Sequence, residues 1–284
     1  MMTMNGVRKA YRKCRDLFLF QKAEKHSSSY ARDHVRTDEK IDFGRLKFQV
    51  LISYLVFLPF GYLFVAGLKF WGRFQVSNMR EIRKQFREIA KKDAPLIICS
   101  NHLTYIDSAI IIWALAPIWW YFFHFKKLSW NFPAGDHFRK KWIHRVVAFL
   151  SKCIYIHRDG SVEHKNSVLN TAFKLLQKGH FVTLFPEGQR SRTGRFDLNK
   201  RTYGVGKLLS QLKEKRVLCV YLRGNKQENY TAYPPLGSTF FMDMELIHPS
   251  SNRQGREAYS DYVQQVTSKI HQLEEKYFAD RSAA

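Results

Sequence analysis

A histidine and an aspartate separated by four residues are the pair in this sequence best suited to chemistry. His102 and Asp107 directly follow an apolar, strand-like run at residues 96–99. An imidazole titrates near neutral pH, and a carboxylate bonded to one ring nitrogen leaves the other free to accept a proton. The pair is therefore a candidate general base with its orienting group. A surface ion pair would show the same spacing, so the interpretation depends on the residues that accompany it.

Two further polar segments follow apolar runs downstream. The run at 153–156 is followed by Arg158, and the run at 181–185 by the loop 186–194. This loop contains arginines, hydroxyl groups and glycines, which together can form a phosphate cradle. Because α/β sheets place ligands just beyond their strand ends, we expect the three polar segments to meet at one site.

From residue 79 onward the chain alternates between segments typical of helices and of strands. We predict helices at 81–92, 109–116, 138–150, 161–177, 203–212 and 258–278, and strands at 96–99, 119–123, 153–156, 181–185 and 217–222. This alternation indicates an α/β domain at 79–284, with a mixed, mostly parallel sheet flanked by helices. The last helix is expected to pack on the domain without taking part in chemistry.

The segment before this domain has the composition of a membrane anchor. Residues 48–68 are 21 residues without a charged side chain, long enough for a helix to cross a bilayer. Pro59 and Gly61 interrupt the run at its midpoint, and both flanks carry Lys and Arg. Because cytoplasmic flanks retain basic residues, we favour a helical hairpin dipping into one leaflet over a single transmembrane helix. We therefore predict a basic segment and membrane-anchoring hairpin at 1–78, and a buried core hairpin is less favoured.

The charge balance points to an anionic partner. Lys and Arg number 47 against 24 acidic residues, which gives a net charge of +23. Nucleic acid, an anionic membrane surface or a phosphorylated substrate could each provide the opposite charge. The sequence contains no recognisable nucleic-acid-binding module, and nucleic acid would not explain the uncharged run. We therefore expect an anionic membrane surface and no nucleic acid.

Other residues that could carry chemistry are better explained by structure. Cys14, Cys99, Cys153 and Cys219 form no CxxC pair, as is typical of buried thiols in a reducing compartment. His137 and His144 lack a third ligand, so we expect no metal site. The Gly-Val-Gly-Lys stretch at 204–207 lacks the other residues of a phosphate loop and is better explained by helix packing.

Four ordered blocks resemble those of the glycerophospholipid acyltransferase family (PlsC-like), which includes 1-acylglycerol-3-phosphate acyltransferase. His102 and Asp107 match its HxxxxD block, Arg158 its second block and Phe-Pro-Glu-Gly at 185–188 its third. The fourth corresponds to the apolar run at 217–222, without the family's usual proline. Gln189 stands where the family usually has a threonine or serine.

The resemblance implies a membrane-bound acyltransferase that esterifies the hydroxyl of a lysophospholipid, with acyl-CoA or acyl carrier protein as donor. His102 would act as general base oriented by Asp107, without a covalent acyl-enzyme or a cofactor. The implied acceptor-binding residues are Arg158, Glu187, Gly188 and Arg192. Arg190 could be either a ligand contact or a solvated loop charge.

The resemblance leaves the acceptor open between several lipids. Conversion of 1-acyl-sn-glycerol-3-phosphate to phosphatidic acid is the best match, and another lyso-lipid or glycerolipid is the alternative. A non-catalytic, basic membrane-surface protein is less favoured. The implied location is the inner (cytoplasmic) membrane, with the active site facing the cytoplasm. The aromatic segment at 113–130 would line an acyl tunnel, seat the domain at the interface or form a core strand.

Overall fold

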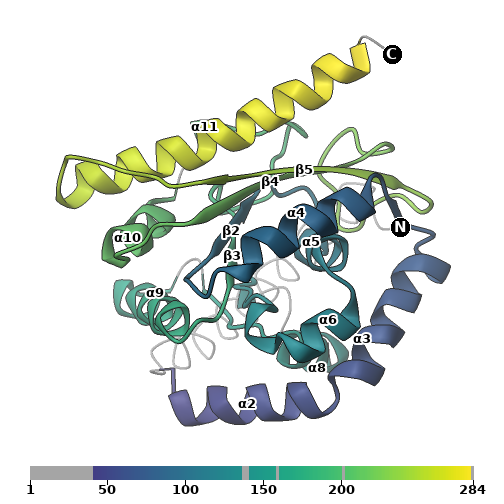
Figure 1. Ribbon diagram of the computed structural model, residues 1–284, viewed down its shortest axis with the longest axis horizontal. Coiled ribbons are helices and arrows are strands. Elements are labelled where there is room, and N and C mark those ends of the chain that lie inside the picture. Colours follow the sequence, from purple (N-terminus) through teal and green to yellow (C-terminus); the bar gives the residue numbers. More distant parts are fainter. Residues whose placement is uncertain (1–40, 136–140, 158–159, 200–201, 283–284) are drawn as a thin grey trace, which may run out of the picture.

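A computed structural model describes residues 41–135, 141–157, 160–199 and 202–282 (Figure 1). The described residues form a five-stranded sheet of order β1-β5-β4-β2-β3. Its strands are β1 (Gln75–Val76), β2 (Ile97–Ser100), β3 (Val182–Leu184), β4 (Val217–Gly224) and β5 (Thr239–Ile247). β2 is parallel to β3 and β4, β1 is parallel to β5, and only the β4–β5 pair is antiparallel. The predicted mixed, mostly parallel sheet is confirmed.

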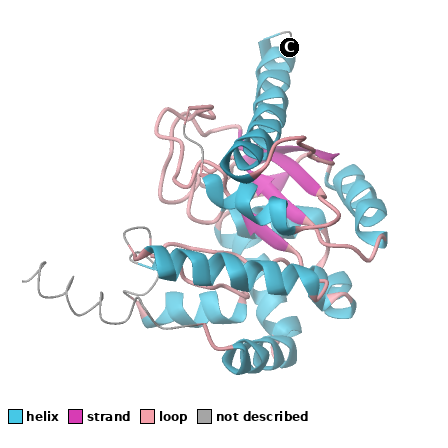
Figure 2. Ribbon diagram, turned by 90° about the vertical axis from the view of Figure 1, so that its left-hand side faces the viewer, coloured by secondary structure: helices cyan, strands magenta, loops and turns pink. Residues whose placement is uncertain are grey.

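Helices cover both faces of the sheet (Figures 1 and 2). One face packs against α4 (Met79–Lys91), α5 (Asp107–Leu115) and α6 (Ile118–Phe123). The other packs against α9 (Val162–Gln177), α10 (Tyr203–Gln211) and the long α11 (Gly255–Ser282). In β2, Ile98 joins the first core, whereas Ile97 and Cys99 join the second. Two-sided burial explains why β2 reads as a continuous apolar run rather than an alternating one.

Two helices precede the sheet in the region of the predicted hairpin, and the 68° bend between them is smaller than that of an antiparallel hairpin. They are α2 (Phe43–Leu55) and α3 (Phe57–Ala66), and α3 continues into a π-helical turn, η1 (Gly67–Trp71). The chain turns at Val56 rather than at the predicted midpoint. Pro59 cannot donate to the Leu55 carbonyl, so α2 ends there, and Pro59 itself fits the first turn of α3.

No single helix among the described residues has the length and apolar composition to cross a membrane. Within the same described residues, α2 and residues 57–71 meet the criterion when they are taken together, as a pair bent by 68°. Residues 1–40, the basic part of the predicted anchor, lie outside the described residues.

The strand predicted at 119–123 is wrong, because these residues form α6. These five consecutive aromatic residues have high strand propensity and show no periodicity, so their sequence does not distinguish a helix from a strand. Pro117 precedes the helix, and its carbonyl accepts hydrogen bonds from Trp120 and Tyr121. Trp120 packs on Phe86 in the core, with ring centroids 5.7 Å apart, so the segment is not a core strand.

The strand predicted at 153–156 is also absent as a regular element. Cys153 and Ile156 make isolated parallel bridges to Asn131 and Ala134. Pro133 lies between these bridges and has no backbone N–H, so the ladder is interrupted. The helix predicted at 138–150 is described only as α8 (Trp142–Leu150), because residues 136–140 lie outside the described residues.

α10 crosses α11 at very close range, and Gly206 makes this possible. A Cβ atom at Gly206 would lie 2.2 Å from the Tyr259 carbonyl oxygen of α11, which is less than a van der Waals contact. At Gly204, on the same helix, the nearest atom would be Leu169 Cδ2 at an ordinary 3.6 Å. The glycine-containing stretch at 204–207 therefore serves helix packing.

Gly206→Ala is expected to lower the free energy of unfolding by about 1–3 kcal/mol, because the two helix backbones must separate. Gly204→Ala, the matched control, should raise it by up to about 1 kcal/mol through helix propensity. Denaturant unfolding of both variants measures the difference. Equal effects at the two positions would contradict the close crossing.

Candidate active site

The parallel pairing of β2, β3 and β4 brings their carboxyl ends to one edge of the sheet. The chain leaves β2 toward His102 and leaves β3 toward Glu187. The two loops touch directly, since the Ser191 amide donates to the His102 carbonyl at 2.8 Å. The first and third polar segments of the sequence therefore meet, as expected. Arg158, from the second segment, lies outside the described residues.

His102 and Asp107 form a hydrogen-bonded pair. The distance from His102 Nδ1 to Asp107 Oδ2 is 2.9 Å. The Asp107 carboxylate, at the first residue of α5, is buried and accepts further hydrogen bonds from the Leu103 and Thr104 amides at 2.6 and 2.8 Å. These donors stabilise the charged carboxylate and fix its orientation. With Nδ1 engaged, Nε2 is the ring nitrogen that can accept a proton.

The third segment supports the His102 ring directly. Phe185 stacks on the imidazole, with ring centroids 4.1 Å apart and planes inclined by 19°. The His102 side chain is 15% exposed, so one edge of the ring stays accessible. Sequence reasoning gave Phe185 no role, although its position immediately before Pro186 and Glu187 placed it at the site.

Asn101 ties the His102 loop to β4. Its side-chain amide donates to the Leu222 carbonyl at 2.9 Å, and its side-chain oxygen accepts from the Leu222 amide at 2.8 Å. One side chain thus satisfies both backbone groups of a single β4 residue. The sequence did not predict this structural role of Asn101, because the contact joins residues 121 positions apart.

Glu187 is buried and organises its own loop. The Ser191 hydroxyl lies 2.6–2.7 Å from both carboxylate oxygens. Burial raises the pKa of Glu187 to about 7, and hydrogen bonds from Ser191 and from the backbone oppose the shift. Gly188 follows with φ +67°, and a Cβ there would lie 2.4 Å from Thr202 Cγ2. Only glycine fits this turn without strain.

The two predicted loop arginines have different surroundings. Arg190 donates to the Thr231 carbonyl at 2.8 Å and to the Tyr105 hydroxyl at 3.0 Å. Its guanidinium also stacks on the Tyr105 ring at 4.0 Å, so Arg190 joins two loops of the protein. Arg192 is exposed and has no polar partner among the residues that the structure describes. It is the loop arginine left available for a ligand.

A family model described as Acyltransferase matches residues 73–221, just over half of the 284-residue chain. The chain belongs to this family. The match is to the PlsC-like glycerophospholipid acyltransferases and makes the protein a lipid acyltransferase. It spans β1 to most of β4, and thus the His102 pair and the Glu187 loop, but neither the α2–α3 pair nor α11. No curated protein matches the chain significantly.

In this acyltransferase the buried Glu187 predicts a pH-dependent stability. The folded state holds the Glu187 proton up to about pH 7, whereas the unfolded chain releases it near 4.5. The contribution of Glu187 to the free energy of unfolding therefore falls as the pH rises from 4.5 to 7. Glu187→Gln should be more stable than the wild type by up to about 3 kcal/mol above pH 7, and no more stable near pH 4.

Denaturant unfolding between pH 4 and 8 measures this difference. Glu228→Gln, at an exposed position, is the control and should follow the wild type throughout. A stability difference for Glu187→Gln that does not change with pH would contradict the proposed titration.

Proposed function

We propose that this protein transfers an acyl group from acyl-CoA or acyl carrier protein to the free hydroxyl of a lysophospholipid. The preferred reaction converts 1-acyl-sn-glycerol-3-phosphate to phosphatidic acid. The observation that supports it best is the His102–Asp107 hydrogen bond at 2.9 Å beside a loop that carries a free guanidinium. Membership of the acyltransferase family supports the reaction class.

The chemistry follows from what an alcohol needs to attack a thioester. His102 Nε2 removes the hydroxyl proton as the oxygen forms a bond to the thioester carbonyl carbon. The Asp107 carboxylate stabilises the imidazolium that results. When the tetrahedral intermediate collapses, the carbon–sulfur bond breaks and the departing thiolate takes the proton from His102. The products are the ester and the free thiol, and the imidazole is regenerated.

The described cysteines are poor candidates for an acyl-enzyme nucleophile. Burial raises the pKa of the Cys153 thiol to about 12, and burial also raises the pKa values of Cys99 and Cys219. A thiol must ionise to act as a nucleophile, so these side chains stay unreactive at neutral pH. Direct attack by the acceptor hydroxyl is therefore the favoured route.

Arg192 and Arg158 are proposed to bind the acceptor phosphate. A guanidinium can donate two parallel hydrogen bonds to a phosphate, which also fixes the orientation of the lipid headgroup. Arg192 is exposed at the site edge, and Arg158 is assigned through the family's second block. Glu187 and Gly188 contribute by shaping the loop. An acceptor with a different headgroup is the alternative, and a panel of lyso-lipids separates the two.

His102→Ala is expected to lower the rate of acyl transfer by at least about a thousandfold, and Asp107→Asn by about a hundredfold or more, because proton removal is lost or misdirected. Membranes containing the protein are supplied with labelled acyl-CoA and a panel of lyso-lipids, and products are identified by mass. His248→Ala, at an exposed histidine, is the control and should retain full activity.

Two outcomes of this assay contradict the proposal. Equal activity of His102→Ala and wild type would leave a non-catalytic membrane protein as the explanation. Acylation only of lyso-lipids without a terminal phosphate would reject the phosphatidic acid assignment and the phosphate role of Arg192.

The side chains at residues 48–55 of α2 support membrane attachment, because the polarity of this part of the helix is inverted. Gln49 and Ser53 face the protein, where they are 5% and 1% exposed, and both donate to the Phe149 carbonyl at the end of α8. Phe48 and Leu55 face outward and are 58% and 66% exposed. A helix in water would bury the apolar side and expose the polar one. We infer that the outer side of α2 lies in lipid.

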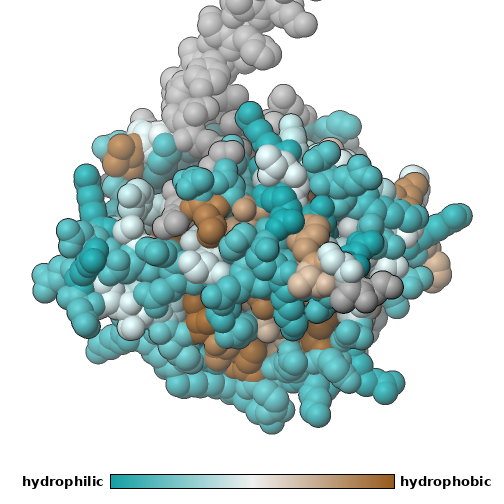
Figure 3. All heavy atoms as spheres, turned by 90° about the horizontal axis from the view of Figure 1, so that it is seen from above, coloured by the Kyte–Doolittle hydropathy of each residue, from teal (hydrophilic) through white to brown (hydrophobic). Residues whose placement is uncertain are grey.

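The apolar surface continues beyond α2. Its exposed members on the other helices are Leu63, Phe70, Trp71, Trp119, Phe123, Trp142 and Ile143. In Figure 1, α2, α3 and α8 lie on the lower side of the molecule, opposite α11. The face that carries α11 is mainly hydrophilic, with several separate apolar patches (Figure 3). This asymmetry supports a membrane-facing side, with Trp119 and Phe123 at the interface, and we propose the cytoplasmic leaflet of the inner membrane as its location.

The triple variant Leu55→Ser, Leu63→Ser, Phe70→Ser is expected to bind vesicles containing phosphatidylglycerol at least about tenfold more weakly than the wild type, because less apolar area enters the lipid. Co-sedimentation with vesicles measures the bound fraction. Tyr203→Ser removes a large side chain from α10 that is 62% exposed, and it is the control. Unchanged binding of the triple variant would reject this side as the membrane contact.

A further inference from the structure

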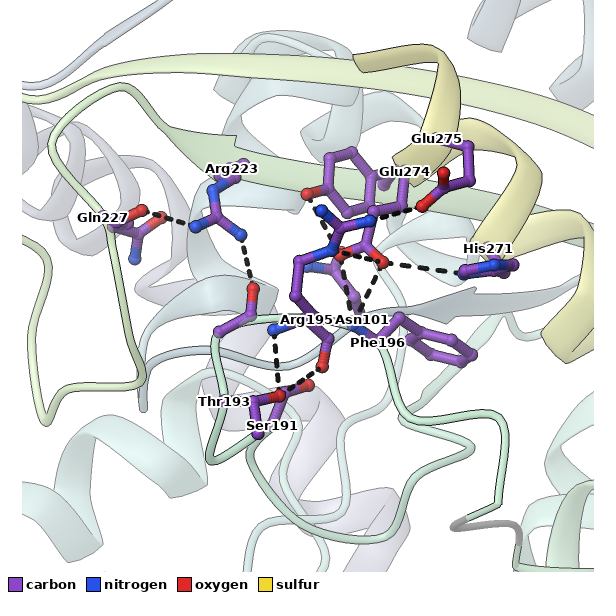
Figure 4. A network of polar contacts seen from close by, with 12 residues as sticks. Asn101, Ser191, Thr193, Arg195, Phe196, Arg223, Gln227, His271, Glu274 and Glu275 are labelled. Carbon is purple, nitrogen blue, oxygen red and sulfur yellow. Dashed lines mark hydrogen bonds and ion pairs between the residues drawn. The ribbon is translucent and has the colours of Figure 1, made fainter. Parts of the chain in front are cut away.

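A buried carboxylate of the C-terminal helix reaches the loop that carries Arg192 (Figure 4). We propose that Glu274 of α11 is a positioning residue for acyl transfer: through Arg195 and Phe196 it holds the loop so that Arg192 faces the acceptor phosphate. The proposal rests on the proposed function, since it assigns the phosphate to Arg192. It gives α11, which lies outside the family match, a part in substrate binding.

The contacts of Glu274 concentrate on one end of the loop. Its side chain is 1% exposed, and its carboxylate accepts from the Phe196 amide at 3.0 Å and lies 3.3 Å from Arg195 Nε. The Tyr221 hydroxyl of β4 adds a longer contact of 3.4 Å. A buried carboxylate is unfavourable unless it is paired, so the loop must be in place for α11 to pack as it does.

The same helix holds the Arg195 guanidinium from two further sides. Glu275 forms a second ion pair with Arg195, and the Phe278 ring lies 3.9 Å from the guanidinium carbon. Glu274 and Phe278 are four positions apart and share one face of α11. Two carboxylates and an aromatic ring therefore fix one arginine, and this set, Glu274, Glu275 and Phe278, is called the Arg195 clamp below.

Two more anchors hold the loop, at Gly194 after Arg192 and at Ser191 before it. Buried Arg223 of β4 donates to the Gly194 carbonyl and also to the Gln227 carbonyl at 2.7 Å (Figure 4). Gly194 has φ +70°, and a Cβ there would lie 2.1 Å from the Glu228 carbonyl oxygen, so the loop rests directly on the turn after β4. Ser191 is held by the His102 carbonyl and by Glu187.

These anchors leave only Arg192 and Thr193 between two fixed points. The backbone of Arg192 is therefore constrained, while its guanidinium remains exposed to a ligand. A constrained backbone lowers the entropy lost when the side chain pairs with a phosphate. Loosening the Arg195 clamp should thus weaken acceptor binding without touching the His102 pair.

A divalent cation is the alternative explanation for this cluster. Ligand atoms of His271, Glu274 and Glu275 lie within 4.8 Å of one another. Arg195, however, is already paired with both carboxylates and would have to be displaced by a metal ion. The arginine supplies the positive charge that a cation would bring, so the positioning role is favoured.

The test compares steady-state kinetics of Glu274→Gln and the wild type, with 1-acyl-sn-glycerol-3-phosphate as acceptor and acyl-CoA as donor. We expect the KM for the acceptor to rise about tenfold and the KM for the donor to change less than twofold. Because Glu274 is buried, Arg195→Ala at the surface is a second variant with the same expected effect, and Arg195→Lys should restore part of it. Glu245→Gln breaks another ion pair of α11, with Lys269, and is the matched control.

A double substitution identifies the residue through which Glu274 acts. Added to Arg192→Ala, Glu274→Gln should raise the acceptor KM less than twofold further, because the residue that it positions is gone. A lower Tm with an unchanged acceptor KM in both Glu274→Gln and Arg195→Ala would overturn the positioning role. Activity that EDTA abolishes and that is lost in His271→Ala would also overturn it, in favour of a metal site. An unchanged acceptor KM in Arg192→Ala itself would instead reject the phosphate role on which the proposal rests.

Discussion

The position of β2 between two parallel neighbours determines where the candidate site can form. Pairing with β3 and β4 in the same direction sends the chain out of all three strands at one edge of the sheet. Asn101, the first residue after β2, forms hydrogen bonds with Leu222 of β4. His102 stacks on Phe185, just after β3. The histidine is therefore held by both neighbours of its own strand. A change of register in β2 would separate it from both contacts at once.

The charged groups around this edge divide into those that are satisfied within the protein and those that are not. The buried carboxylates Asp107, Glu187 and Glu274 each accept hydrogen bonds from loop residues. Hydrogen bonds to these buried carboxyl groups are short and directional, so they fix loops that have no regular secondary structure. Among the loop arginines with a described environment, Arg190 and Arg195 are used in the same way. In the described part of this loop, Arg192 thus stays available to a ligand while Arg190 and Arg195 hold the surrounding segments in place.

The sequence was most informative where periodicity or a local motif carried the signal. Continuous apolar runs identified β2 and β4, and the spacing of His102 and Asp107 identified a pair that the fold brings into hydrogen-bonding distance. β5 was not predicted, because Asp243 and Glu245 interrupt its apolar run, although Phe240, Met242 and Met244 alternate with less buried positions. α6 was mistaken for a strand because aromatic side chains favour strands unless their neighbours provide a helical packing surface. The clamp on Arg195 could not be foreseen, since it joins residues about eighty positions apart.

The two hydrogen bonds that Gln49 and Ser53 make to the Phe149 carbonyl have a consequence for how deep the enzyme sits. Gln49 also reaches the Cys153 carbonyl, so α2 is fastened to the segment that leads toward His157 and the second block. A helix joined in this way is a rigid spacer rather than a flexible tether. In the proposed membrane-bound state, the height of His102 above the lipid is then set by the fold itself. The acceptor headgroup, and not the enzyme, would have to rise out of the bilayer to be acylated.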